Sequence, residues 1–330
     1  MEKLLWKKSE FEIYYNCSGR TFQEWAQYGH PNAPIGGFYL ALGTFYMLLM
    51  MPFMIVFIKT DLTKYSCYKI MFSLGICDVI GILIASFFAG FGSLTGNVFC
   101  LFPIMNYIAG CIGLAIWVAS SSLCILLALN RCIDVIGLKL GNLLFDGKKT
   151  YIWISICIIY SLWFLFFNNP SLFNSNFHAF IFDPYVGTPE RNGGIDIVNY
   201  PHVGMSLHDI IVPIVLILLY FMLCVYIAIK SKMAVAVKIS KMQRQTFIQS
   251  TLICSATLIT SFIYVYMQYF PTPYWLSLFG QFSWQLCHGA AGLSYAFLNE
   301  TMRREAKYLY CPKSRQKNIK IASSSDVHTK

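Results

Sequence analysis

Charged residues are scarce in this chain, and long parts of it contain almost none. Only 12% of the 330 residues are Asp, Glu, Lys or Arg. Seven apolar stretches contain no Lys or Arg, and only Asp78 and Asp209 place a carboxylate within them. A large water-soluble helical protein needs charge on its exposed helix faces, so this distribution argues against that class.

Each apolar stretch is long enough to cross a lipid bilayer, whose core of roughly 30 Å needs about 20 residues of helix. Lipid offers no partner to unpaired backbone groups, so helices are expected throughout these stretches. We therefore predict an all-α membrane protein, a seven-transmembrane helix bundle. The predicted spans are Ile35–Ile58, Ile70–Leu94, Leu101–Leu129, Tyr151–Asn168, Leu207–Ile229, Phe247–Phe270 and Leu276–Leu298.

Lys and Arg gather in alternate gaps between the stretches. The gaps 59–69, 130–150, 230–246 and 299–330 together hold 20 of the 25 cations, and the other gaps hold five. The positive-inside rule then places the N-terminus outside and the C-terminus in the cytosol. The net charge of +10 follows from loops that face anionic lipid, and it does not call for nucleic acid as a partner.

The pattern divides the chain into four parts, and no cleavable signal peptide is expected because residues 1–12 are too charged. We expect an extracellular segment 1–34, a transmembrane domain 35–298, an amphipathic membrane-surface helix 299–311 and a disordered cytosolic tail 312–330. In the amphipathic helix an apolar face would be formed by Met302, Ala306, Leu309 and Tyr310. Cys311 at its end is a palmitoylation candidate. The fold of the long outer gap, 169–206, is not predicted.

Ten of the twelve cysteines lie in spans or on the predicted cytosolic side. Cys17 and Cys100 remain outside, where disulfides persist, so we expect them to form a bridge; two unpaired thiols are the alternative. The triplet Asn16-Cys17-Ser18 is a glycosylation acceptor.

Signs of an active site are missing from the sequence. It has no phosphate-binding glycine loop, no HExxH motif, no nucleophile–base pairing and no Cys/His spacing typical of metal ligands. We therefore expect no enzyme activity, no cofactor and no metal.

Three polar residues inside spans are candidates for an intramembrane switch, namely Asp78, Ser120 and His288. Asp78 lies in the middle of a span, where a carboxylate is costly and points to function. We expect its neighbours to be polar groups of the third span, such as Ser120, Ser121 or Ser122. The alternatives for Asp78 are an ion or proton site that biases two helix arrangements and a neutral, hydrogen-bonded packing residue. For His288 a hydrogen-bonded core residue is favoured over a ligand-binding one.

The outer halves of the predicted helices are aromatic with a few polar groups, as ligand pockets between helices are. Trp and Tyr also gather at membrane interfaces as anchors, which is the competing explanation. The candidate ligand-binding residues are Asn106, Tyr107, Trp163, His208, Tyr264, Gln268, Gln281, Trp284 and Gln285.

Several segments resemble the nematode serpentine chemoreceptors of the Srt class, which are seven-helix G-protein-coupled receptors. The strongest are CYKIMFSLGICD at 67–78 and GQFSWQLCHG at 280–289; YNCS at 15–18, FCLFP at 99–103, LNRCID at 129–134, YVYMQ at 264–268 and LN at 298–299 also fit. The resemblance implies the sensing of environmental chemicals by a small-molecule site, in the plasma membrane of sensory-neuron cilia, with coupling to a heterotrimeric G protein.

The resemblance also changes the interpretation of Arg131. The sequence alone favours a positive anchor, whereas the position matches the Arg that ends the third helix of rhodopsin-like receptors. The residue before it is Asn130 rather than an acid, and spans six and seven lack the Trp–Pro and Asn-Pro-x-x-Tyr switches, so those switches are not transferred. The candidate G-protein-coupling residues are Arg131, Asp134, Lys241, Arg244, Asn299 and Arg303.

Three alternatives to a receptor remain open. A seven-helix ligand-gated channel of the insect olfactory type would place its N-terminus inside, against the charge pattern. A transporter would be expected to have more polar spans. A receptor-like protein without signalling would act only through assembly as an oligomer.

Overall fold

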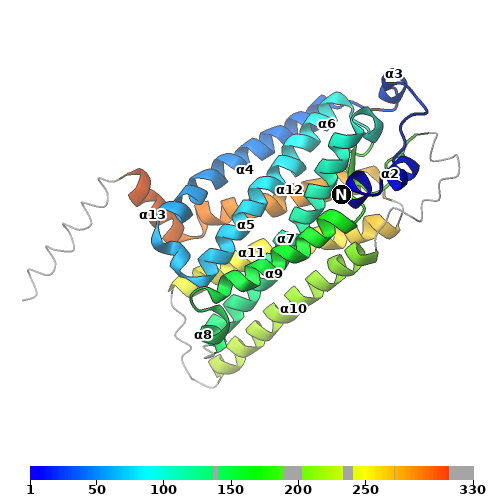
Figure 1. Cartoon of the computed structure of the whole chain (residues 1–330). Helices are drawn as coiled ribbons and strands as arrows, with labels where there is room; N and C mark the ends of the chain where they lie inside the picture. The colour runs from blue at the N-terminus through cyan, green and yellow to red at the C-terminus, as the bar shows by residue number, and fades with distance from the viewer. Residues whose placement is uncertain (137–139, 189–202, 233–240, 271, 312–330) are drawn as a thin grey trace, which may run out of the picture.

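The chain folds into a bundle of long helices that lie side by side (Figure 1). The computed structural model describes residues 1–136, 140–188, 203–232, 241–270 and 272–311. Within them, seven long helical units run along the bundle, and the predicted seven-helix fold is confirmed. The units are α4 (Ala33–Lys59), α5–η2–α6 (Ser66–Ile82, Leu83–Phe88 and Ala89–Thr95), α7 (Pro103–Ile136), α9 (Lys149–Phe167), α10 (Val203–Lys232), α11 (Lys241–Tyr269) and α12 (Tyr274–Phe297).

Six of these seven units are long and apolar enough to cross a membrane, and α12 is the exception. Its polar side chains, such as Gln281, Gln285 and His288, are buried inside the bundle. Most helices also run past the predicted spans. For example, α7 continues to Ile136 and α11 begins at Lys241, because helical hydrogen bonds continue where the hydrocarbon ends.

The centre of the bundle is α7. In its most apolar 18-residue window 72% of the residues are buried, against 22% in the corresponding window of α9. Large apolar side chains such as Leu48, Ile159 and Phe221 are exposed on the outside of the bundle. Such an apolar outer surface is what a lipid-facing helix requires.

One end of the bundle carries short helical elements and a β-hairpin (Figure 1). The hairpin is an addition to the predicted all-α fold, within the loop whose fold was not predicted. Its strands pair antiparallel, with Phe173 opposite Phe180, and the Phe180 ring packs on Trp284 with centroids 5.2 Å apart. The elements at this end are α1 (Glu2–Leu5), α2 (Lys8–Tyr14), α3 (Phe22–Ala26), η3 (Phe99–Leu101), β1 (Leu172–Asn174) and β2 (Ala179–Ile181).

The opposite end carries α13 (Glu300–Tyr310), α8 (Leu140–Phe145) and η1 (Asp61–Lys64). On α13, Met302 is buried against the core, and the hydroxyl of Tyr310 donates to the Pro52 carbonyl of α4 at 2.9 Å. The apolar face expected there therefore rests partly on the bundle. The predicted tail 312–330 lies outside the described residues.

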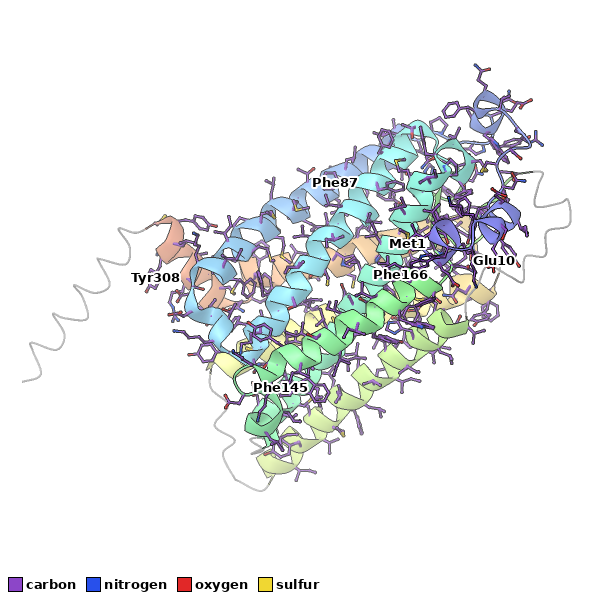
Figure 2. All side chains as sticks on the ribbon, viewed as in Figure 1. Met1, Glu10, Phe87, Phe145, Phe166 and Tyr308 are labelled. Atoms are coloured by element: carbon purple, nitrogen blue, oxygen red, sulfur yellow. A yellow bond between two sulfur atoms is a disulfide. The ribbon has the colours of Figure 1, made fainter. Side chains whose placement is uncertain are left out.

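The two described chain ends lie at opposite ends of the bundle. Met1 lies beside Phe166 at the end of α9, and Tyr308 of α13 lies at the other end of the bundle, the end that also carries Phe145 of α8 (Figure 2). The Met1 amino group donates to the Leu165 carbonyl at 2.9 Å. A chain that runs along the bundle an odd number of times has its two ends at opposite ends of the bundle.

Candidate functional site

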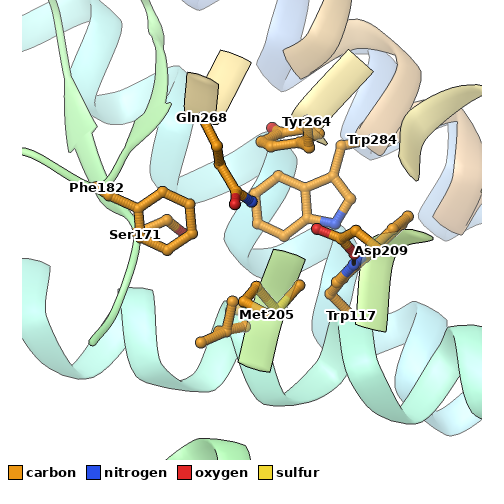
Figure 3. A pocket seen from close by; sticks show the side chains of 10 residues that line it. Trp117, Ser171, Phe182, Met205, Asp209, Tyr264, Gln268 and Trp284 are labelled. Atoms are coloured by element: carbon orange, nitrogen blue, oxygen red, sulfur yellow. Dashed lines mark hydrogen bonds between the residues drawn. The ribbon is translucent and has the colours of Figure 1, made fainter. Parts of the chain in front are cut away.

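A cavity lies among the helix ends on the side of the bundle that carries the hairpin (Figure 3). The empty space between its lining side chains, open solvent included, is about 360 Å³. The lining residues are Gly113, Leu114, Trp117, Ser171, Phe182, Met205, Asp209, Tyr264, Gln268 and Trp284.

Helical spacing brings these side chains together. Met205 and Asp209 lie four residues apart on α10, as Tyr264 and Gln268 do on α11, so each pair shares one face of its helix. On α7, Gly113 allows a close approach, because a Cβ atom there would lie 3.2 Å from the Trp284 ring. The indole of Trp284 therefore closes the cavity against α7.

Asp209 is the one acidic residue in the lining, and it is almost fully buried, with 1% of its surface exposed. Its Oδ1 accepts a hydrogen bond from Trp117 Nε1 at 2.8 Å. In the part of the chain that the structure describes, its Oδ2 has no hydrogen-bond partner, and neither the Tyr264 hydroxyl nor Trp284 Nε1 has one. The cavity therefore presents one carboxylate oxygen and two further polar groups that a bound molecule can satisfy.

Beside Asp209, His208 ties three helices together. Its Nε2 lies 2.8 Å from Ser121 Oγ of α7, and its Nδ1 lies 3.2 Å from Tyr160 Oη of α9. His208 is buried but does not line the cavity. Both of its ring nitrogens are engaged by these contacts between helices.

Of the nine candidate ligand-binding residues, three line the cavity: Tyr264, Gln268 and Trp284. The Gln268 side chain accepts a hydrogen bond from Ser206 Oγ, which fixes its position. Gln281 and Gln285 lie elsewhere, because both amides donate to the Ala85 carbonyl, at 2.8 and 3.0 Å. Ala85 belongs to η2, a π-helical segment with a widened turn, so these two side chains supply hydrogen bonds to the backbone of that segment.

The other three candidates also lie away from the cavity. Asn106 exchanges hydrogen bonds with Asn97 and holds the connection between α6 and α7. Tyr107 packs edge-on against Tyr15, with centroids 5.0 Å apart, beneath the N-terminal segment. Trp163 is 46% exposed on the outer face of α9, which suits the interface-anchor explanation.

Two of the three candidate switch residues, Asp78 and His288, form a pair. Asp78 Oδ1 lies 3.0 Å from His288 Nδ1, and both side chains are buried. In the described part of the chain the hydrogen bond of Asp78 thus goes to α12 and not to the serines of α7, where the Ser120 side chain is buried. Ser121 bonds to His208 instead.

At the opposite end of the bundle, Arg131 is buried in a polar network. Its Nη2 lies 3.0 Å from Asp134 Oδ2 and donates to Asn130 Oδ1 at 2.5 Å. Asn130 in turn donates to Ser66 Oγ of α5 at 3.0 Å. The guanidinium is only 6% exposed, whereas the Asp134 side chain is 38% exposed, so the network sits just below the end surface of the bundle.

The remaining candidate coupling residues differ in exposure. Asn299 is buried and caps α13 by accepting from the Met302 amide at 2.9 Å, so it is not free to meet a partner protein. Arg303 is exposed on α13. Lys241 and Arg244 lie in the first turns of α11, and their side chains lie outside the described residues.

On the hairpin side, Cys17 and Cys100 form a disulfide, with Cα atoms 5.4 Å apart. Asn16 beside it is exposed, and its Oδ1 accepts from the Ser18 amide at 2.8 Å. Burial lowers the pKa of His178 in the hairpin, and nearby His30 lowers it further.

At the other end of the bundle, the palmitoylation candidate Cys311 follows α13 directly and is exposed.

Three comparisons with known proteins agree with this architecture. The family model described as "Serpentine type 7TM GPCR chemoreceptor Srt" matches residues 3–319. Serpentine receptor class T-55 of Caenorhabditis elegans is 30% identical over 311 residues, which are 93% of this chain and 84% of that protein. The crystal structure of squid rhodopsin matches with a TM-score of 0.59 over 85% of each chain at 16% identity, a likeness of fold alone. The chain belongs to the Srt family of serpentine seven-transmembrane chemoreceptors.

Proposed function

We propose that this protein is a chemosensory receptor that binds a small molecule in the cavity and activates a heterotrimeric G protein at the opposite end of the bundle. The observation that carries the proposal is the cavity itself. It joins four of the long helices, α7, α10, α11 and α12, so a bound molecule contacts all of them at once. A ligand that fits one arrangement of these helices better than another shifts the equilibrium between them.

The same helices carry the change to the far end. Trp117 lines the cavity on α7, and Arg131 lies about four turns further along the same helix. The proposed coupling surface is formed by Arg131, Asp134 and the exposed Arg303, with the start of α11. A cation released from its carboxylate there is available to a partner protein.

In the proposed orientation the hairpin end faces the cell exterior and α13 lies at the cytosolic leaflet of the plasma membrane, in sensory cilia. The alternating Lys and Arg counts support this orientation. Asn16 would then be glycosylated and Cys311 palmitoylated. Epitopes added at each chain end test the orientation in intact cells: the N-terminal one is expected to be reached by antibody, and the C-terminal one only after permeabilisation.

The function is tested by a ligand screen in cells with a G-protein readout, comparing wild type with Arg131→Ala at equal surface expression. We expect responses in wild type and none in Arg131→Ala. A full response in the variant would remove Arg131 from the mechanism. Ligand-gated currents in cells without G proteins would instead favour a channel.

A further inference from the structure

We propose that the cavity selects small organic ammonium ions, through the carboxylate of Asp209 and the aromatic rings around it. The inference rests on the proposed ligand-binding function and names the chemical class of the ligand. Figure 3 shows the Asp209 carboxylate beside the indole of Trp284 and above that of Trp117.

The charge of the lining residues favours a cationic ligand. Of the ten lining residues in the described part of the chain, Asp209 is acidic and none is Lys, Arg or His. Trp117 Nε1 satisfies one carboxylate oxygen, and no described residue donates to the buried Oδ2. A buried carboxylate is costly without donors, and a charged donor stabilises it more than a neutral one. A ligand that brings an N⁺–H group completes the site.

The walls of the cavity include several aromatic side chains. Four lining residues are aromatic, namely Trp117, Phe182, Tyr264 and Trp284. Tyr264 and Trp284 meet edge-on, with centroids 6.2 Å apart and planes at 75°, so they present differently oriented surfaces. Aromatic faces attract organic cations, most strongly where water is excluded, and such cages are used to bind ammonium groups.

The size of the cavity and its further polar groups restrict the ligand. The empty space, about 360 Å³ with open solvent included, admits only a small molecule. Among the described residues, the Tyr264 hydroxyl and Trp284 Nε1 have no hydrogen-bond partner, so they can donate to an acceptor atom elsewhere on the ligand. A compact amine with an aromatic or branched body fits these conditions.

The test uses two probes of equal size and shape, 2-phenylethylammonium and the neutral 2-phenylethanol. The purified full chain in detergent is titrated with each, and the concentration that raises its Tm is measured. We expect the ammonium ion to act at a concentration at least about tenfold lower than the alcohol, because charge-assisted hydrogen bonds are roughly twice as strong as neutral ones. Asp209→Asn keeps an acceptor for Trp117 and removes the charge, so it is expected to lose this preference.

The control variant is Asp61→Asn, which removes an exposed carboxylate at the other end of the bundle and is expected to keep the preference. Equal action of the two probes on wild type overturns the proposal without any variant, and so does a preference that persists in Asp209→Asn. A panel of primary, tertiary and quaternary ammonium ions that leaves the wild-type Tm unchanged also overturns it.

G-protein activation is read separately in cells. Ammonium binding without G-protein activation supports the ligand class and contradicts the proposed signalling. Activation by neutral compounds that is unchanged in Asp209→Asn supports the signalling and contradicts the ligand class.

Discussion

His288 of α12 and Asp78 of α5 meet inside the bundle, with 3.0 Å between Nδ1 and Oδ1, although 210 residues separate them in the sequence. Asp78 Oδ2 and His288 Nε2 are buried without further hydrogen bonds in the described residues. Among the described residues, each of the two side chains has its hydrogen bond from the other, and the pair joins α5 to α12 at a buried point.

Replacing His288 with Ala is expected to lower the free energy of unfolding by about 1–3 kcal/mol, because the Asp78 carboxyl is left buried without its partner. The readout is the Tm of the purified chain in detergent. Asp78→Asn keeps a hydrogen-bonding side chain of nearly the same shape, so its Tm should fall less than that of His288→Ala. Equal Tm values for wild type and His288→Ala would show that the pair does not stabilise the fold.

Replacing Gly110 with Ala is expected to disturb the cavity from outside its lining. A Cβ atom at this position on α7 would lie 2.1 Å from the Ser171 carbonyl oxygen, so the segment that leads into the hairpin must move. Ser171 lines the cavity, and we expect weaker agonist potency together with a lower Tm. Gly37→Ala on α4 is the control, since nothing lies within 4 Å of its Cβ position. A Gly110→Ala receptor with wild-type potency would contradict this prediction.

The seven spans were predictable because lipid imposes a simple rule on the chain: long runs without charge form helices. Even α12, which is less apolar than the other spans, was recognised, since it contains no Asp, Glu, Lys or Arg. The hairpin was not predicted. Its register and its packing against Trp284 depend on contacts far apart in the sequence, and the loop has no strong alternation of apolar and polar residues.

The polar contacts inside the bundle were less predictable. Apolar residues face both lipid and core, so hydropathy does not fix which way a helix is turned. Polar neighbours of Asp78 were therefore expected on α7, whereas its hydrogen bond goes to α12, and Trp163 was a ligand-binding candidate although 46% of it is exposed.

Asp209 was set aside because the predicted span began at Leu207 and placed this carboxylate at its end. The helix begins at Val203 and buries it. A carboxylate inside an apolar stretch was the signal that identified Asp78, and the same signal could have identified Asp209. Trp117, its partner, had no local signal, because an indole in a span is equally typical of a packed core.

Replacing Cys17 and Cys100 together with Ser is expected to destabilise the chain by about 2–4 kcal/mol, since the bridge closes a long loop in the unfolded chain. The bridge spans 83 residues and anchors the N-terminal segment to the start of α7. We expect a lower Tm and lower surface expression, and a similar loss when wild type is reduced. Cys224→Ser, which replaces an exposed free thiol, serves as the control. An unchanged Tm after complete reduction would show that the bridge does not stabilise the fold.

Replacing Asp134 with Asn is expected to raise basal G-protein activation. The carboxylate lies 3.0 Å from Arg131 Nη2 and is 38% exposed, so the ion pair is worth about 0.5–1 kcal/mol. Losing that much stabilisation of the resting arrangement shifts the equilibrium by roughly two- to fivefold toward the arrangement in which Arg131 is free. Nucleotide exchange on the G protein, measured without ligand and at equal surface expression, is the readout. Asp146→Asn removes an exposed carboxylate at the same end of the bundle and should leave the basal rate unchanged. A basal rate in Asp134→Asn no higher than in that control would mean that the Arg131–Asp134 contact does not hold the receptor at rest.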